Sequence, residues 1–373
     1  MTLKIFNRNA YAVLLAVLCA AGGIGVLFYS TNAAFTSGLF PCVSGLLASV
    51  ILAPLFHEAG HVVFAKACGF YVAYCKVFAF EYNAVKDKKR FALCSPFSAE
   101  QTQAAPKYAE KRAGEMKKRA ALYTAGGLIF SGILLLITAV FAAVFTAVST
   151  NASSGAAKGA SCFFAGALPY AAYLFLLNVV PFTYGGGKTD MRVLLDILKQ
   201  TPCGVRFVAA LNAQGGIAEG KAYSEIDGEY LYNLPVIAED EPLFIMNLFF
   251  QYFAAAEKGD LRAAAETINR IASLAPYLTP QEEKSALCEL AYMNSVTGDT
   301  VQAEKCYTAL SAYGEFVTAA ETRAAAAYYF LRNDAALYGD YVRRAEDAAQ
   351  KEKLSGVRKS EALLLLQISG GDK

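Results

Sequence analysis

Long apolar runs constrain the fold of this chain more than any other feature of its sequence. Four such runs cover residues 10–30, 41–66, 120–148 and about 160–182. Each run has about the 20 residues that a helix needs to cross the apolar core of a bilayer. The chain is also 55% hydrophobic, whereas soluble proteins have roughly 45–50% apolar residues. The sequence therefore predicts a mainly α-helical fold, built on a polytopic membrane bundle with four spans.

The first apolar run has an alternative interpretation as a signal peptide. Ala33-Ala34, just after it, resembles a cleavage region. The run is longer than the apolar core of a typical signal peptide, however, and another apolar run follows at once. We therefore expect the first run to be an uncleaved helix.

The distribution of Lys and Arg residues predicts the orientation in the membrane. Eleven of them lie between Lys76 and Arg119, whereas the loop at 31–40 has none and the loop between the third and fourth runs has only Lys158. Positively charged loops stay in the cytoplasm. We therefore expect a multi-pass protein of the cell membrane with cytoplasmic N- and C-termini.

Net charge and cysteine content exclude some other functions. The net charge is only +2, which gives no reason to expect nucleic-acid binding. The nine cysteines include no C-x-x-C pair, their number is odd, and several lie in apolar runs. Such cysteines are typical of reduced, structural thiols in a cytoplasmic or membrane environment.

Residues 67–119, between the second and third apolar runs, differ from both runs in composition. Residues 69–82 are rich in Tyr, Phe and Val, which predicts a β-strand. Residues 91–97 are its expected partner in a small β-hairpin, and the charged stretch at 86–90 is the expected turn. A charged stretch at 109–119 is predicted to be helical.

The apolar spans stop after about residue 200. Residues 1–200 are therefore the predicted membrane domain. Residues 201–240 are mixed in character and contain Gly, so we expect a linker region. Residues 241–370 are rich in Ala and amphipathic at helical period, which predicts a soluble, cytoplasmic helical domain.

Turn signals divide this helical domain at regular intervals. Gly259-Asp260, Gly298-Asp299 and Asn333-Asp334 lie 39 and 35 residues apart. At each one, an aromatic-containing helical stretch precedes the turn and an Ala-rich stretch follows it. The pattern resembles tetratricopeptide repeats, whose unit is about 34 residues of helix-turn-helix. An irregular helical bundle is the alternative.

The only two histidines of the chain lie in the second apolar run, in the sequence His57-Glu58-Ala59-Gly60-His61. On a helix, residues four apart share a face, so both imidazoles can bind one tetrahedral Zn²⁺. Glu58 then lies beside the metal without being a ligand, where it can take a proton from water. Ionisable residues inside a membrane span are also candidates for function. A hydrogen-bonded pair of histidines facing a bundle interior is the alternative.

A second motif follows the fourth run. Asn178-Val179-Val180-Pro181 ends that run, and three glycines and Asp190 come shortly after it. Together with the motif at 57–61, this pattern resembles the site-2 protease family of intramembrane zinc metalloproteases, over roughly residues 40–200. That family pairs H-E-x-x-H on one span with N-x-x-P and a downstream Asp-Gly on another. Here Met191 follows Asp190, where the family has Gly.

The resemblance implies roles for individual residues. His57, His61 and Asp190 would be zinc ligands, Glu58 the base that activates water, and Asn178 a contact to the substrate backbone or the oxyanion.

Each residue of the second motif also has a structural alternative. Asp190 could instead be an acid in the first turn of a helix that Thr189 caps. In that case Asp196 is the fallback ligand. The alternative role of Asn178 is a polar contact between helices. The alternative role of the glycines at 185–187 is a flexible turn.

The resemblance further implies a zinc metalloendopeptidase. It would cut a peptide bond in or next to a transmembrane segment of a membrane-protein substrate, in regulated intramembrane proteolysis. A membrane-anchored helical-repeat scaffold with a degenerate metal site is the alternative. A transporter is less favoured, because four spans are few and no inverted repeat is visible.

Two regions outside the motifs have expected roles in binding. An exposed edge of the strand at 69–82 would capture the unwound substrate by strand addition, or this hairpin would simply lie at the membrane surface with an aromatic belt. The helical repeats would bind a regulatory protein or the cytoplasmic part of the substrate. A cap over the membrane domain is the alternative role for the repeats.

Overall fold

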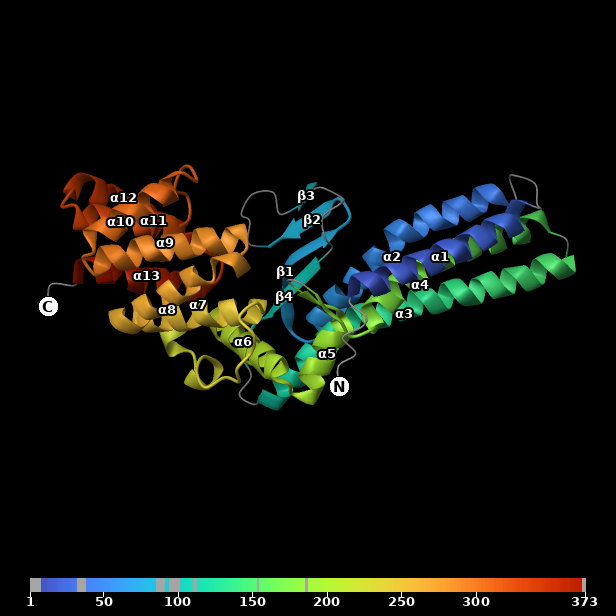
Figure 1. Cartoon of the computed structure of the whole chain (residues 1–373), viewed down its shortest axis with the longest axis horizontal. Helices are drawn as coiled ribbons and strands as arrows, with labels where there is room; N and C mark the ends of the chain where they lie inside the picture. Colours follow the sequence, from blue (N-terminus) through green and yellow to red (C-terminus); the bar gives the residue numbers. More distant parts are fainter. Residues whose placement is uncertain are drawn as a thin grey trace. The chain divides into compact units, whose positions relative to one another are not determined.

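The computed structural model of the chain is shown in Figure 1. It describes residues 8–31, 38–84, 91–93, 101–109, 113–152, 154–184 and 187–370. The chain divides into two compact units. The first comprises Met1–Ala105 and Lys117–Lys199, and the second Pro106–Met116 and Gln200–Lys373.

Four long helices make up most of the first unit: α1 (Arg8–Thr31), α2 (Leu39–Ala67), α3 (Ala113–Ala152) and α4 (Gly155–Val179). Three of them, α2, α3 and α4, are long and apolar enough to cross a membrane, which indicates that the protein is associated with a membrane. Three of the four predicted spans are therefore matched. In α1 the apolar part among the described side chains is shorter, Tyr11–Val26. Helix α3 begins earlier than the predicted span, because the charged stretch before it continues the same helix.

Glycines bring these helices close together. A Cβ atom on Gly45 of α2 would lie 1.9 Å from the carbonyl oxygen of Phe163 in α4, and one on Gly166 would lie 2.1 Å from that of Cys42. Inside the H-E-x-x-H motif, a Cβ on Gly60 would lie 2.2 Å from the carbonyl oxygen of Gly126 in α3. Small residues allow helix backbones to approach closely in membranes. The motif on α2 is therefore pressed directly against α3.

A four-stranded sheet lies between α2 and α3 in the sequence. Its strands are β1 (Phe70–Val77), β2 (Phe80–Asn83), β3 (Phe91–Leu93) and β4 (Gln101–Pro106), in the order β3-β2-β1-β4. Strand β2 runs antiparallel to both β1 and β3. Strands β3 and β4 are thus the two edges of the sheet.

The sheet corrects two predictions. The single strand expected at 69–82 is two strands, because Phe78 adopts a positive φ of 53° and the chain turns back there. The expected partner at 91–97 contributes β3, which pairs with β2, while the expected turn at 86–90 lies outside the described residues. Strand β1 has neighbours on both sides, so the edge expected at 69–82 is not open along β1.

Helices make up most of the second unit: α6 (Pro202–Glu219), α7 (Pro242–Glu257), α8 (Leu261–Ser273), α9 (Pro280–Val296), α10 (Thr300–Ser311), α11 (Ala319–Leu331), α12 (Ala335–Gln350) and α13 (Ser355–Gly370). Short 3₁₀ turns lie at Tyr223–Glu225, Gly228–Tyr230 and Ala275–Tyr277. The region 201–240, expected to be a linker, is folded. It contains α6, and its buried Ile217 and Leu231 pack in one cluster with Phe250 of α7.

The three turn signals of this unit are confirmed as turns between helices. Gly259 and Gly298 have φ values of 74° and 80°, and Asn333 has 55°, a region that favours Gly and Asn. The Asp that follows each of them caps the next helix and accepts a hydrogen bond from a backbone amide three residues later, at 3.1 Å in each case. The same local chemistry therefore produces three helix pairs, α7–α8, α9–α10 and α11–α12.

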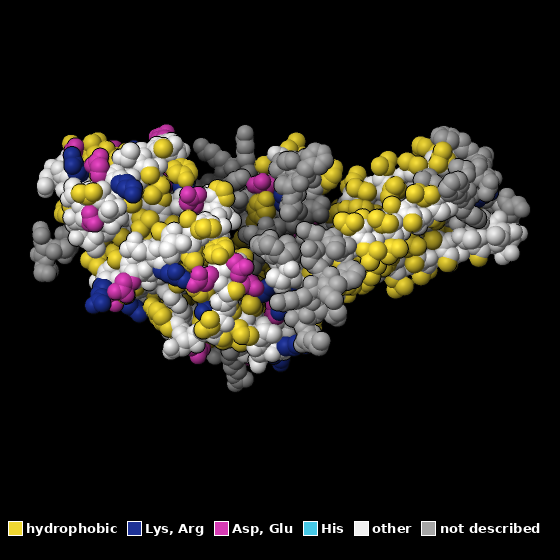
Figure 2. All heavy atoms as spheres, in the orientation of Figure 1, with side chains coloured by type: hydrophobic (Ala, Val, Ile, Leu, Met, Phe, Trp, Pro, Cys, Tyr) yellow, Lys and Arg dark blue, Asp and Glu magenta, His cyan; other side chains and the backbone are white. Residues whose placement is uncertain are grey.

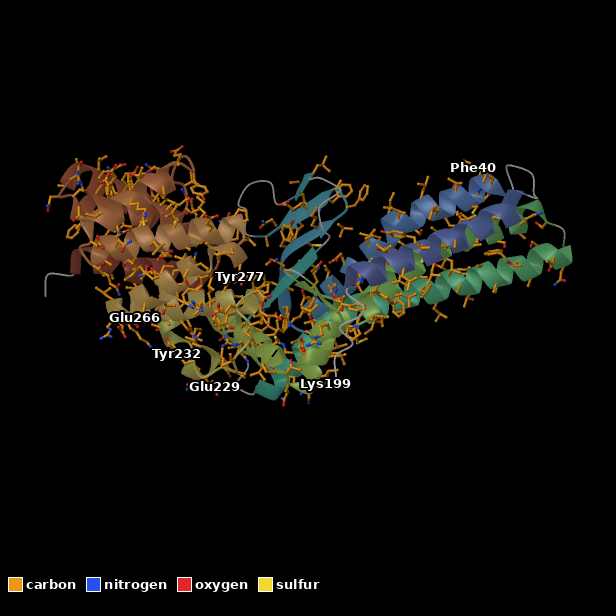
Figure 3. The ribbon with its side chains drawn as sticks, in the orientation of Figure 1. Phe40, Lys199, Glu229, Tyr232, Glu266 and Tyr277 are labelled. Carbon is orange, nitrogen blue, oxygen red and sulfur yellow. The ribbon has the colours of Figure 1, made fainter. Side chains whose placement is uncertain are left out.

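The surfaces of the two units differ in chemistry. On the face shown in Figure 2, hydrophobic side chains gather over the helices of the first unit, whereas Lys, Arg, Asp and Glu side chains are spread over the second. Leu136 of α3 and Leu47 of α2 are 64% and 60% exposed. Phe40, labelled in Figure 3, lies near the start of α2, whereas the labelled Glu266 lies on α8. A membrane suits the first surface and water the second.

Candidate metal centre

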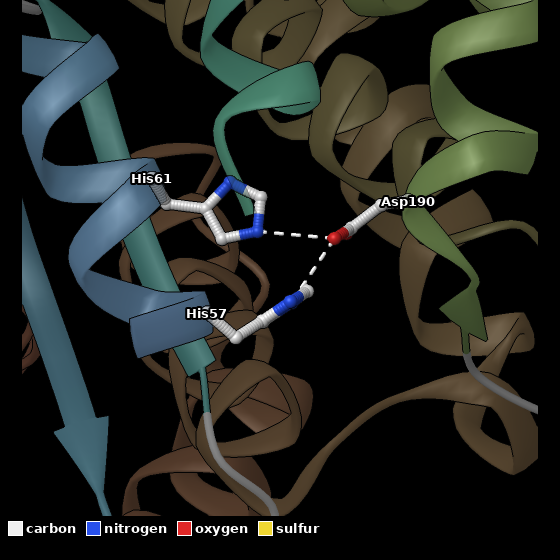
Figure 4. A group of neighbouring side chains, drawn as sticks. All are labelled: His57, His61 and Asp190. Atoms are coloured by element: carbon white, nitrogen blue, oxygen red, sulfur yellow. Dashed lines mark hydrogen bonds and ion pairs between the residues drawn. The ribbon is translucent and has the colours of Figure 1, made fainter. Parts of the chain in front are cut away.

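Three predicted metal ligands lie together in the first unit. His57 and His61 lie one turn apart on α2 with their ring centroids 5.0 Å apart. The Nε2 atom of each ring lies 3.1 Å from Oδ2 of Asp190, as Figure 4 shows. The ligand atoms of the three residues all lie within 4.8 Å of one another. The structure therefore brings together side chains that are up to 133 residues apart in the sequence.

A short hairpin after α4 positions Asp190. Strands β5 (Thr183–Tyr184) and β6 (Gly187–Lys188) pair antiparallel, and α5 (Asp190–Lys199) begins two residues later. The buried hydroxyl of Thr189 donates to the carbonyl of Val180 (2.8 Å) and accepts from the amide of Phe182 (3.0 Å). The hairpin is thereby closed at its base. Asp190 is thus both a first-turn helix acid and a member of the cluster; Gly185 and Gly186 lie outside the described residues.

Two further predicted residues, Asp196 and Asn178, lie outside the cluster. The carboxylate of Asp196, the fallback ligand, accepts from Lys188 Nζ at 3.2 Å and from Arg192 Nε at 3.3 Å. Asn178 Nδ2 donates to the carbonyl of Leu174, one turn earlier in α4, at 3.1 Å. The structure therefore assigns neither of them to the group formed by the two histidines and Asp190.

Helix α3 fixes the orientation of both imidazoles. His57 Nδ1 lies 2.9 Å from Ser131 Oγ, and His61 Nδ1 lies 3.1 Å from the carbonyl oxygen of Tyr123. A carbonyl oxygen only accepts hydrogen bonds, so His61 Nδ1 carries the proton. In a neutral ring, Nε2 then presents a lone pair, as metal-binding histidines do.

This tautomer makes the cluster electrostatically incomplete. The lone pair of His61 Nε2 faces a carboxylate oxygen of Asp190 at 3.1 Å, and two acceptors at that distance repel each other. A cation between them, or a second proton on the ring, removes the repulsion. Two imidazole nitrogens and one carboxylate oxygen form a donor set of the kind found in catalytic zinc sites, which keep a fourth position open. Mg²⁺ and Ca²⁺ prefer oxygen ligands, so this donor set fits Zn²⁺ better.

Gly127 of α3 makes room for the two rings. A Cβ atom at this position would lie 2.3 Å from His61 Nε2 and 2.8 Å from His57 Cε1. Real Cβ atoms do not approach that closely, so any side chain here would displace the histidines. The sequence alone does not reveal a role for Gly127, Ser131 or Tyr123. The only signal for them was the Gly126-Gly127 pair in the third apolar run.

Glu58 is buried next to His57, with 5% of its surface exposed. Its Oε2 atom has no hydrogen-bond partner among the residues that the structure describes. A buried carboxylate oxygen without a partner is costly. Such an atom is suited to accept a proton from a molecule bound at the site.

Comparisons of the chain with protein-family models, with curated proteins and with solved structures found no match. The resemblance to the site-2 protease family therefore stays a prediction. Support for a function comes from the geometry of the cluster itself.

Proposed function

We propose that this protein is an intramembrane zinc metalloprotease, similar to the site-2 protease family, which cuts a peptide bond in or next to a transmembrane segment. The observation that carries the proposal is the convergence of His57, His61 and Asp190, with the proton of His61 fixed on Nδ1. A zinc ion held there would polarise a substrate carbonyl and lower the pKa of water.

Each residue of the site has its own role in the proposed reaction. His57, His61 and Asp190 would hold the metal, and Ser131 and the carbonyl of Tyr123 fix the orientation of the two rings. Glu58 takes a proton from the attacking water and later gives it to the leaving amine. In this proposal Asn178 exchanges its bond within α4 for one to the substrate backbone.

The membrane setting follows from the helices. In the proposed arrangement α1 is a fourth span beside α2, α3 and α4, and both termini are cytoplasmic. The motif lies in the second half of α2, so with this proposed orientation cleavage occurs toward the cytoplasmic side of the cell membrane. The released product therefore leaves inward.

Substrate capture is assigned to an edge of the sheet. A transmembrane helix must unwind before its peptide bond is cut, and an unwound segment can add to a strand at a sheet edge. Strand β4 is such an edge. Tyr123, whose carbonyl holds His61, also donates its hydroxyl to the carbonyl of Thr102 in β4 at 2.9 Å. This contact links β4 to the helix that supports the metal ligands.

A Glu58→Gln variant tests the proposal. The membrane proteomes of cells with the unchanged protein and with Glu58→Gln are compared, together with the zinc content of both purified proteins. We expect equal zinc content, and cleaved fragments of a membrane protein only with the unchanged chain. Cleavage by Glu58→Gln would overturn the assigned base. A chain without stoichiometric zinc, in which His57→Ala is silent, would instead favour a membrane-anchored scaffold.

A further inference from the structure

Two arginines are buried in the described part of the second unit: Arg206 of α6 and Arg323 of α11, which are 9% and 0% exposed. Arg323 lies between two acids, Glu289 and Glu361, at 2.7 and 2.8 Å. Arg206 forms no ion pair with any residue that the structure describes, and both of its hydrogen-bond acceptors are neutral. A buried charge is costly unless an opposite charge compensates it. Arg206 therefore lacks the counter-charge that its burial calls for.

The two neutral acceptors leave part of the Arg206 guanidinium unused. Nε donates to the carbonyl of Pro235 at 2.5 Å, and Nη1 donates to Oδ1 of Asn247 at 3.4 Å, which is long for a hydrogen bond. Nη2 donates to no described residue and is not sealed from solvent. A guanidinium has five N–H donors in a fixed plane. The edge formed by Nη1 and Nη2 therefore has donors to spare for a ligand.

Asn247 of α7 adds another unused donor beside this edge. The residue is 1% exposed, and its Nδ2 atom has no hydrogen-bond partner in the described part of the chain. Because arginine only donates, the amide oxygen of Asn247 has to face Arg206, and the two ends of the amide cannot be exchanged. Both ends are bonded to one carbon, so Nδ2 also lies close to the guanidinium. A buried polar atom without a partner is rare in folded proteins.

The surroundings of Arg206 supply no negative charge. Burial lowers the pKa of its guanidinium, and among the described residues only the Cys203 thiol has an electrostatic effect that opposes this. The acids at 239–241 follow Pro235 closely in the sequence, but none of them forms an ion pair with Arg206. The guanidinium also lies over the ring of Phe244, at 5.7 Å from its centroid. The site thus offers a positive charge and unused N–H donors between apolar walls.

The charge and shape of the open edge favour a carboxylate. Arg206 brings one positive charge, and the planar pair of N–H donors on Nη1 and Nη2 matches the two oxygens of a carboxylate. A phosphate group would bring about 1.5–2 negative charges at neutral pH, which one guanidinium leaves partly uncompensated. Only 9% of Arg206 is exposed, so the ligand has to enter end-on with a flat group. A carboxylate meets all three conditions.

We propose that Arg206 and Asn247 form a binding site for a carboxylate group. Its oxygens accept from Nη1 and Nη2 of Arg206, and one of them also accepts from Nδ2 of Asn247. The group belongs to a small free acid or to an acidic side chain of a peptide, which share this chemistry. Arg206 also holds residues 231–241, the segment without helix or strand before α7, through the carbonyl of Pro235. The bound carboxylate therefore stabilises this segment. The proposal is independent of the metal centre.

The first test needs no variant. The full-length purified chain is placed in sodium acetate or in sodium chloride at equal ionic strength, and hydrogen exchange of residues 231–241 is followed by mass spectrometry. We expect acetate to slow this exchange at least about threefold and in a saturable way, because a ligand of the native state suppresses local opening. Equal exchange in the two salts, or an effect that does not saturate, would overturn the proposal.

Asn247→Asp tests the site itself, because it supplies a carboxylate beside Arg206 from the chain. Exchange of residues 231–241 should then be slow in chloride already and should no longer respond to acetate. Asn269→Asp is the matched control, since this asparagine is exposed on α8 and its amide donates only within its own helix. It should keep the acetate response of the unchanged chain. An undiminished acetate response in Asn247→Asp would contradict the assigned site.

Peptides distinguish the two sources of the carboxylate. A short peptide with one Glu and blocked termini is compared with its Gln counterpart and with acetate, by titration calorimetry on the full-length chain. A Glu peptide that binds at least about tenfold more tightly than acetate, with no binding of the Gln peptide, would identify an acidic side chain. Binding of acetate alone would identify a small acid. Equal binding of the Glu and Gln peptides would overturn the proposal.

Discussion

Each unit contains one of two buried polar clusters, and the two clusters differ in how their polar and charged groups are paired. Arg323 in the second unit is balanced by Glu289 and Glu361 from two other helices. In the first unit, His61 turns an acceptor nitrogen toward the acceptor oxygen of Asp190. In the first arrangement both acids share the Arg323 cation, whereas in the second a cation, proposed to be Zn²⁺, would relieve the repulsion between the two acceptors. A buried polar cluster is thus a candidate ligand site when two acceptors in it face each other with neither a proton nor a cation between them.

The largest effect is expected at Gly127, because the space that it leaves belongs to the histidine rings. Gly127→Ala should remove zinc from the purified protein almost completely, measured as metal per chain by mass spectrometry. Gly132→Ala in the same helix is the control. Its added Cβ would lie 3.3 Å from the Phe175 ring, so a small ring movement accommodates it. Full zinc content in Gly127→Ala would contradict the geometry of the site.

A substitution in the buried cluster of the second unit should change the stability of that unit rather than the metal content of the protein. Arg323→Met leaves Glu289 and Glu361 buried without a cation, which typically costs about 3–5 kcal/mol. Chemical denaturation of the purified chain, followed by circular dichroism, measures the loss. Arg262→Met is the control, because its ion pair with Glu266 is exposed at both ends and should contribute nothing measurable. An unchanged midpoint for Arg323→Met would mean that the two acids are not held as described.

A smaller effect is expected when an orienting contact of the candidate metal centre is removed. Ser131→Ala deletes the partner of His57 Nδ1, and loss of such a contact typically lowers metal affinity about 10–100-fold. Zinc competition with a chelator measures the shift. Ser149→Ala, in the same helix, removes a hydroxyl that, among the described residues, donates to the carbonyl of Thr146 in its own helix. Equal zinc affinity for both variants would mean that Ser131 does not support the proposed zinc site.

The smallest effect is expected at a helix cap, which belongs to neither cluster. Asp299→Ala removes the side chain that accepts from the amide of Gln302 and should destabilise the second unit by about 1 kcal/mol. Thermal unfolding gives the comparison, with Asp299→Asn as the control that keeps the cap. A loss of stability as large as that of Arg323→Met would contradict the expected difference between a helix cap and a buried ion-pair cluster.

Local features of this chain could be predicted from its sequence. The turns at Gly259, Gly298 and Asn333 follow from the residues at each turn, since Gly and Asn adopt positive φ and the next Asp caps a helix. Likewise, the spacing of His57 and His61 places both rings on one face of any helix.

Features that depend on contacts between distant elements could not be predicted. Ser131 and Gly127 meet the histidines only because α3 packs against α2 with one particular rotation. Strand β4 has the sequence QTQAAP, without the β-branched run that marks strands. The region 201–240 resembled a linker because many of its buried residues are Ala and Gly, which carry little hydrophobic signal.

Asp190, and not Asp196, is proposed to complete a zinc site with His57 and His61. Zinc per chain in Asp190→Asn and Asp196→Asn tests it most directly, because both variants remove one charge from α5. We predict about one zinc per chain for the unchanged protein and for Asp196→Asn, and a loss of most of the zinc for Asp190→Asn. Zinc retained by Asp190→Asn, or lost only by Asp196→Asn, would contradict the account.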